Sequence, residues 1–155
     1  MKQAHVLLPQ SVLELMTREA ERTFPKESGG ALMGYRDVDD EDLIQVVAQI
    51  GPGPEAIHET HRFEPDGKWQ ATQIASVYKE SGRVITYLGD WHSHPRGSST
   101  PSSLDRSTAR DIARCDEARA PNPLILIVFG KPEIWDVAAY RRQRWRLRPA
   151  DFDSD

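Results

Sequence analysis

The sequence contains a single cysteine, Cys115. One thiol cannot form an internal disulfide, and it cannot supply a cysteine-rich structural zinc site. The zinc nucleoside deaminases are also excluded, because they need a Cys-x-x-Cys pair in addition to histidine and glutamate. Because Cys115 falls within a helical pattern, we expect it to be a small buried side chain rather than a nucleophile.

Long apolar runs, internal repeats and a strong net charge are also absent. No run approaches the roughly 20 apolar residues of a membrane span, and the N-terminus lacks the apolar stretch of a signal peptide. We therefore expect a cytoplasmic protein without membrane partners. The net charge of −4 argues against a nucleic-acid partner. The length of 155 residues predicts one domain, residues 1–150, followed by an acidic C-terminal tail, residues 151–155.

The hydrophobic pattern alternates between strand-like and helical segments, which predicts a mixed α/β fold. Helices are expected over residues 10–23, 67–81 and 102–118. Strands are expected over residues 4–8, 31–36, 43–50, 57–63, 84–94, 124–129, 134–140 and 144–148. The continuous apolar run over 124–129 is typical of a central strand that is buried on both faces.

His92 and His94 occupy the end of a strand-like segment and are separated by one residue. Because side chains alternate faces along a strand, both imidazoles point the same way. They begin the pattern H-x-H-x7-S-x-x-D, which ends at Ser102 and Asp105. Two imidazoles and a carboxylate leave one tetrahedral position open, as in catalytic rather than structural zinc sites. The pattern therefore predicts one zinc ion per chain, bound by His92, His94 and Asp105.

The same segment permits simpler interpretations. Ser102 and Asp105 have the spacing of a capping box, and Thr100-Pro101 favours a helix start with Thr100 as N-cap. Capping explains neither histidine, and it is compatible with metal binding because a helix start fixes Asp105. Asp90 shares a strand face with the histidines. It either orients a ligand imidazole or lies exposed at the strand end.

A candidate general base, Glu27, lies far upstream, beside Gly29 and Gly30. A zinc hydrolase needs a base that reaches the attacking water without occupying the metal, and a separate glutamate is the usual choice. The glycine pair permits a close approach of backbone segments. Taken alone, however, such a pair also fits the simple end of one element and start of the next.

Together, Glu27, the His-Ser-His-Pro run and Ser-x-x-Asp resemble the JAMM motif of the JAB/MPN/Mov34 metalloprotease family. The resemblance implies that Glu27 and Ser102 are catalytic and that His92, His94 and Asp105 bind zinc, with no motif position substituted. It also implies a curved, mostly antiparallel sheet flanked by helices, similar to cytidine deaminase. Further segments resemble stand-alone bacterial JAB proteins, which are encoded beside E1-like and E2-like enzymes in antiphage operons of the CBASS type. These segments are 51–54, 63–66 and 87–95.

The implied activity is zinc-dependent hydrolysis of the peptide or isopeptide bond after the C-terminus of a ubiquitin-like or analogously conjugated protein. Partners implied in the same way are that substrate and operon-encoded E1-like and E2-like enzymes. We expect the substrate tail to lie along the metal-bearing strand as an added strand. The alternatives are a protease that processes a sulfur-carrier protein and a non-enzymatic MPN scaffold. RadC-type relatives share the His and Ser-x-x-Asp run but are usually longer.

Two further groups of residues attract functional interpretations. His58 and His61 match no motif position, which favours surface or loop roles. The C-terminal segment carries alternating arginines, Arg142, Arg144, Arg146 and Arg148. On one strand they would share a face, as expected for a charged edge strand that resists aggregation. The alternative is a basic stripe that docks an acidic partner protein.

Overall fold

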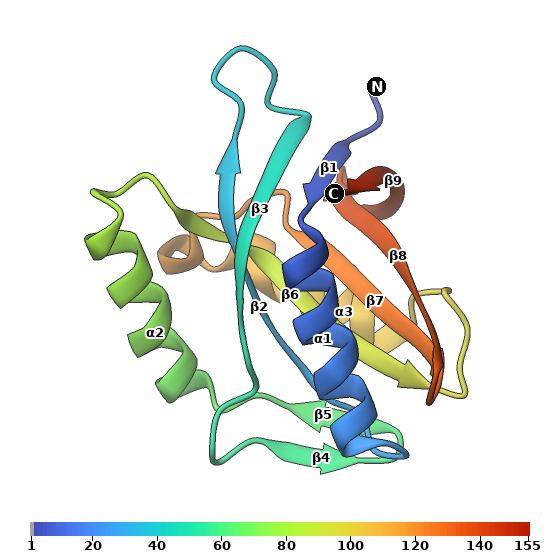
Figure 1. The fold of residues 1–155 in the computed structure, drawn as a ribbon. Coiled ribbons are helices and arrows are strands. Elements are labelled where there is room, and N and C mark those ends of the chain that lie inside the picture. The colour runs from blue at the N-terminus through green and yellow to red at the C-terminus, as the bar shows by residue number, and fades with distance from the viewer. Residues whose placement is uncertain (1) are drawn as a thin grey trace.

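The computed structural model describes residues 2–155, in which seven strands form a closed barrel and two more form a separate two-stranded sheet (Figure 1). The barrel strands are β1 (His5–Leu8), β2 (Gly29–Arg36), β3 (Leu43–Ile50), β6 (Thr86–Pro95), β7 (Leu124–Lys131), β8 (Ile134–Gln143) and β9 (Arg146–Ser154). The small sheet pairs β4 (Ile57–Glu59) with β5 (Arg62–Glu64). The helices are α1 (Gln10–Thr23), α2 (Gly67–Glu80), α3 (Ser103–Arg114) and the short 3₁₀ helix η1 (Asp116–Ala118).

The barrel order is β1-β3-β2-β6-β7-β8-β9, and β1 closes it by pairing in parallel with both β3 and β9. β6 and β7 are also parallel, whereas the other barrel neighbours are antiparallel. The fold is mixed α/β as predicted. Four of the seven barrel pairings are antiparallel, as expected. The expectation of a curved sheet is wrong, because four residues of β1 join the two ends of the sheet into a closed barrel. Residues 151–154, assigned above to an acidic tail, belong to β9 and pair with β1.

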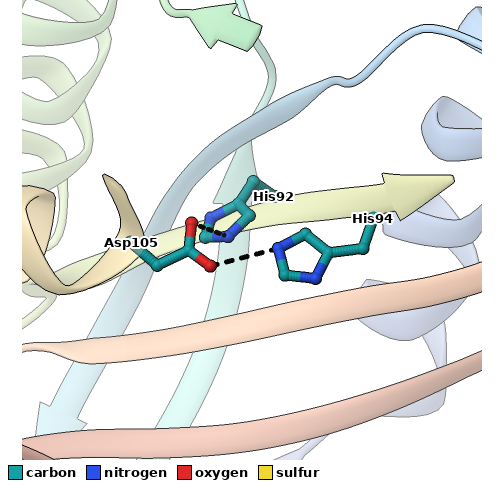
Figure 2. Close-up of side chains that lie close together, drawn as sticks. All are labelled: His92, His94 and Asp105. Carbon is teal, nitrogen blue, oxygen red and sulfur yellow. Dashed lines mark hydrogen bonds and ion pairs between the residues drawn. The ribbon is translucent and has the colours of Figure 1, made fainter. Parts of the chain in front are cut away.

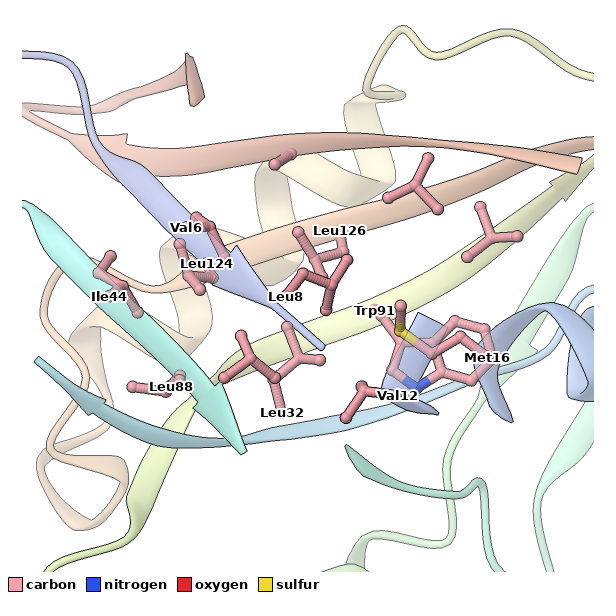
Figure 3. Packing of buried hydrophobic residues seen from close by; sticks show 14 of the residues in the cluster. Val6, Leu8, Val12, Met16, Leu32, Ile44, Leu88, Trp91, Leu124 and Leu126 are labelled. Atoms are coloured by element: carbon pink, nitrogen blue, oxygen red, sulfur yellow. The ribbon is translucent and has the colours of Figure 1, made fainter. Parts of the chain in front are cut away.

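The interior of the barrel holds the main hydrophobic cluster, shown in Figure 3. Leu124, Leu126 and Val128 of β7 point into it, whereas Ile125 and Ile127 belong to a second cluster on the outer face. All five side chains are buried, which confirms the prediction of a strand covered on both faces. The apolar face of α1 covers the interior cluster with the side chains Val12, Met16 and Ala20.

The outer face of the barrel is covered by α2 and α3. On α2, Ile74 and Val77 join a cluster over β2 and β3, while Ala109 of α3 packs over β7. β6 passes between these two helices, and its side chains alternate. Trp91 is buried inside the barrel, so the outward positions of β6 are those of Asp90, His92 and His94.

Several local expectations need correction. Residues 57–64 form a hairpin rather than one strand. α3 ends at Arg114, and Cys115 is exposed rather than buried, because the backbone there leaves the helical conformation. Arg144 lies in the turn between β8 and β9 with a positive φ of 46°, so the alternating arginines do not share one strand. No helix among residues 2–155 is long and apolar enough to cross a membrane.

Candidate metal centre

The structure brings His92, His94 and Asp105 together on the outer face of the barrel, as Figure 2 shows. Nε2 of His92 lies 2.7 Å from one carboxylate oxygen of Asp105, and Nε2 of His94 lies 3.1 Å from the other. One ligand atom from each residue lies within 4.8 Å of the other two. β6 supplies both imidazoles and α3 supplies the carboxylate, so the cluster joins a central strand to a helix start.

Asp105 is held in place by a reciprocal capping box. Its main-chain N–H donates to Oγ of Ser102 at 3.1 Å, and its carboxylate accepts from the Ser102 N–H at 2.7 Å. The N-cap is therefore Ser102 rather than Thr100. Burial raises the pKa of Asp105, but the two imidazoles and the Ser102 N–H outweigh that effect and hold the pKa well below its usual range. The carboxylate is thus ionised and aimed at both histidines.

The two imidazoles have different hydrogen-bond environments. Nδ1 of His94 donates to the Ser98 carbonyl at 2.9 Å, which leaves Nε2 as the nitrogen that faces Asp105. Burial lowers the pKa of His94, but the bonds to Asp105 and Ser98 outweigh it and raise the pKa. Nε2 of His92 is buried and makes no well-directed hydrogen bond, despite its short distance from Asp105.

These features fit a divalent metal ion such as zinc. A buried imidazole nitrogen without a well-directed partner is costly unless it coordinates a cation. The donor set of two imidazoles and one carboxylate is one that zinc accepts, and the carbonyl partner of His94 is the usual means of orienting a ligand ring. The residues present could therefore hold a metal ion.

Glu27 is placed by the pairing of β2 with β6. Gly29 lies opposite His92 in the register, and Ser28 exchanges main-chain and hydroxyl hydrogen bonds with Ser93. The main chain of Glu27 therefore reaches the cluster from the His94 side, and its carboxylate is close enough to both histidines for each to affect its pKa. Burial raises its pKa, the two ligand histidines lower it, and the charge of Asp105 raises it.

The glycine pair after Glu27 permits this close pairing. A Cβ on Gly29 would lie 2.5 Å from the Trp91 carbonyl oxygen, and one on Gly30 would lie 2.0 Å from that of Ile50. Real Cβ atoms do not approach backbone oxygens so closely, so only glycine lets β2 fit between β3 and β6 here.

The β4–β5 hairpin holds the main chain of Glu27, which the sequence analysis missed. The Glu27 N–H donates to the Glu59 carbonyl at 2.8 Å, and Nδ1 of half-buried His58 donates to the Glu27 carbonyl at 2.9 Å. His61 lies in the exposed hairpin turn, and its charge lowers the pKa of Glu27. The only signal in the sequence was the pair of histidines itself, because the contact links segments about 30 residues apart.

Asp90 does not hydrogen-bond to either ligand histidine among the described residues. Its carboxylate accepts a hydrogen bond from the Tyr87 hydroxyl at 2.6 Å. Burial raises the pKa of Asp90 to about 6, against the lowering effects of Tyr87 and His92. Asp90 therefore neither orients a ligand imidazole by a hydrogen bond nor lies fully exposed at the strand end, the two roles expected from the sequence.

Comparisons with known proteins agree with the motif. The family model described as prokaryotic homologs of the JAB domain matches residues 9–148. A probable metalloprotease, y4qB of Sinorhizobium fredii, is 42% identical over 84% of this chain and 79% of its own length. A CD-NTase/cGAS isopeptidase of Escherichia coli is 27% identical over 84% of this chain and 78% of its own length. Another CD-NTase/cGAS isopeptidase, from Vibrio cholerae, is also 27% identical, over 84% of this chain and 78% of its own length.

The fold is shared with a solved structure. Protein DSY2949 of Desulfitobacterium hafniense superposes with a TM-score of 0.74 at 21% identity, covering 97% of this chain and 92% of that protein. An identity this low supports the fold alone. The family match covers most of the chain and includes Glu27 as well as the whole His-His-Asp cluster. The chain therefore belongs to the prokaryotic JAB-domain family of metalloproteases and isopeptidases.

Proposed function

We propose that this protein is a zinc-dependent isopeptidase or peptidase that releases a protein conjugated through its C-terminal tail. The observation that carries this proposal is the His92–His94–Asp105 cluster with a carboxylate, Glu27, beside it but outside it. The relatives named CD-NTase/cGAS isopeptidase support a conjugated protein as the substrate class. The resemblance to stand-alone bacterial JAB proteins extends the proposal to a role in antiphage defence, with E1-like and E2-like enzymes as operon partners.

In the proposed mechanism, His92, His94 and Asp105 hold the zinc ion. When bound, the metal supplies Lewis-acid activation of water and of the substrate carbonyl. Glu27 takes a proton from the attacking water and transfers it to the leaving amine, which is a lysine side chain in an isopeptide. Burial raises the pKa of Glu27, which favours a carboxylate that accepts a proton and later returns it.

Ser102 is proposed to stabilise the oxyanion. Its Oγ accepts the Asp105 N–H, so the hydroxyl proton remains free to donate to a substrate oxygen. Ser102 is exposed and begins the helix that carries Asp105, which places the hydroxyl at the border between the cluster and solvent. Capping and oxyanion stabilisation are therefore compatible roles for this one side chain.

The tail cannot add to β6 as a further strand, contrary to the expectation from the sequence. β2 pairs with β6 over Thr86–His92, and β7 pairs with it over Gly89–Pro95. Both edges of β6 are thus already paired over Gly89–His92, and the Ser93 N–H is bonded to the Ser28 carbonyl.

A cleavage assay tests the proposal. The substrates are a lysine conjugate of the tail-bearing protein encoded beside this chain and ubiquitin dimers, each with and without a zinc chelator. We expect chelator-sensitive release of the operon-matched conjugate and much slower cleavage of ubiquitin dimers. Cleavage that resists the chelator and is not restored by added zinc would contradict the mechanism. Equal rates on both substrates would contradict the proposed specificity.

A further inference from the structure

A groove of about 740 Å³ lies on the outer face of the barrel between α2 and α3. Ala71, Ile74 and Ala75 of α2 form one wall, and Ile112 of α3 with Cys115 and residues 117–119 forms the other. The floor is the outward face of β6, from Thr86 to Asp90. His92 follows Asp90 at the next outward position of β6, so the floor of the groove ends one outward position before the metal cluster.

The groove carries an acidic group on its floor. Asp90 lies on the floor with one hydrogen bond, from Tyr87, and no cation pairs with it among residues 2–155. At the rim, exposed Glu117 and Arg119 have opposite charges, and exposed Asp111 pairs with Arg110 at 4.0 Å. A half-buried carboxylate without a cationic partner, set between apolar walls, is complementary to a positively charged side chain with an apolar stem.

The position of Glu27 tells which part of a substrate the groove can receive. Along β6 the order is Asp90, His92 and His94, and the main chain of Glu27 enters the site from the His94 side. If Glu27 protonates the leaving amine, that amine departs at the His94 end of the cluster. The acyl part, which is the tail of the released protein, then extends in the opposite direction, over His92 and toward Asp90.

We infer that this groove binds the tail of the released protein and that Asp90 is a specificity-determining residue that receives an arginine or lysine side chain from the tail. This inference rests on the proposed function. Two residues of extended chain span about 6.6 Å, so the side chain over Asp90 belongs to a residue two to four positions before the scissile bond. Arginine fits best, because its fork can donate two hydrogen bonds to a carboxylate that already accepts one from Tyr87.

The test uses synthetic tails of six residues joined to the ε-amine of a lysine reporter. One position at a time carries arginine or its neutral analogue citrulline, and the remaining positions are alanine or glycine. Binding is measured on the zinc-loaded Glu27→Gln variant, and cleavage is measured on the zinc-loaded wild-type chain. We expect arginine to exceed citrulline by about tenfold or more at one position, in both binding and cleavage. Asp90→Asn should reduce that ratio to near one.

Two variants serve as controls for the arginine-to-citrulline ratio. Asp111→Asn removes an exposed charge from the rim of the same groove and should keep most of the arginine preference, because exposed charges are screened. Tyr87→Phe removes the donor to Asp90 while leaving the carboxylate, and it should also keep the preference. If Asp111→Asn lowers the arginine-to-citrulline ratio as much as Asp90→Asn does, the preference comes from the overall negative charge of the groove. That result would overturn the assignment of Asp90.

The outcomes separate the two proposals. Cleavage of the tails without any arginine preference overturns the role of Asp90 and leaves the hydrolase intact. An arginine preference in binding that Asp90→Asn removes, together with no cleavage of any tail, supports the groove and contradicts the proposed function. Absence of binding by every tail overturns the groove assignment itself.

Discussion

Three carboxyl groups near the metal cluster differ because their surroundings differ. Asp105 is held ionised by two imidazoles and a main-chain N–H. Burial raises the pKa of Glu27, which suits a group that exchanges a proton. Asp90 accepts a hydrogen bond from Tyr87 and pairs with no cation among residues 2–155, which suits its proposed role of binding a charged side chain of the substrate. The role proposed for each carboxylate therefore follows from its neighbours rather than from its type.

Glu27→Gln should lower the cleavage rate by about 10²–10⁴-fold, because it removes the general base while keeping the side-chain shape. The metal content should remain that of the wild type, since Glu27 lies outside the His-His-Asp set. Cleavage kinetics and metal analysis on the same preparation check both statements. A variant that cleaves at the wild-type rate would reduce Glu27 to a turn residue.

The stability of the same variant should depend on pH in a defined direction. A carboxyl whose pKa is raised by folding contributes stability below its unfolded pKa, and that contribution is lost as the pH rises through the folded pKa. The metal-free Glu27→Gln variant should therefore melt no lower than the metal-free wild type at pH 7. Any advantage of the variant should shrink as the pH is lowered to 4. A lower melting temperature of the variant at pH 7 would show that ionised Glu27 makes a stabilising contact.

At the scale of single elements, local sequence patterns predicted most of what the structure contains. The bounds of α1 and the both-sided burial of β7 follow from apolar spacing over a few residues. The convergence of His92 and His94 follows from strand alternation. The contact of His58 with Glu27 and the turn at Arg144–Trp145 could not be predicted, because the first is nonlocal. The turn depends on Arg144 and Trp145, which both adopt a positive φ although neither is a glycine.

Ser102 belongs to this scale because it both caps α3 and faces the cluster. Glycine at an N-cap costs only a few tenths of a kcal/mol relative to serine, whereas alanine costs about 1 kcal/mol. Ser102→Gly should therefore lower kcat by about 10²–10³-fold through loss of the oxyanion donor, with little change in melting temperature. Ser102→Ala should lower both kcat and the melting temperature, whereas Ser102→Thr should retain both near the wild-type values. A change in melting temperature without a change in kcat would leave Ser102 with the capping role alone.

At the scale of the whole molecule, closure of the barrel depends on the shortest barrel strand described here. β1 shares its four residues with β3 on one side and β9 on the other, and Phe152 of β9 packs against the interior cluster. The sequence could not reveal this closure, because an acidic C-terminal segment resembles a solvated tail. Its pairing partner lies nearly the full length of the chain away.

Removal of residues 151–155 should therefore destabilise the protein by about 3 kcal/mol, through lost ladder hydrogen bonds and lost burial of an aromatic ring. Urea unfolding of the truncated and full-length chains measures the difference. Asp151→Asn and Asp153→Asn in the full-length chain serve as controls, since they remove the acidic charge but keep the strand. A truncation without effect on the unfolding midpoint would show that closure contributes little to stability.

The central claim is that His92, His94 and Asp105 hold a metal ion that acts with Glu27 on an amide bond. Its most direct test measures zinc content and cleavage of the operon-matched conjugate together, in the wild type, His92→Ala, Glu27→Gln and His58→Ala. His58 is a matched control, because it contacts the main chain of Glu27 but lies outside the cluster. We predict one zinc ion per chain in the wild type, Glu27→Gln and His58→Ala, loss of zinc and cleavage in His92→Ala, and loss of cleavage alone in Glu27→Gln. Zinc content in His92→Ala equal to that of the wild type would contradict the account.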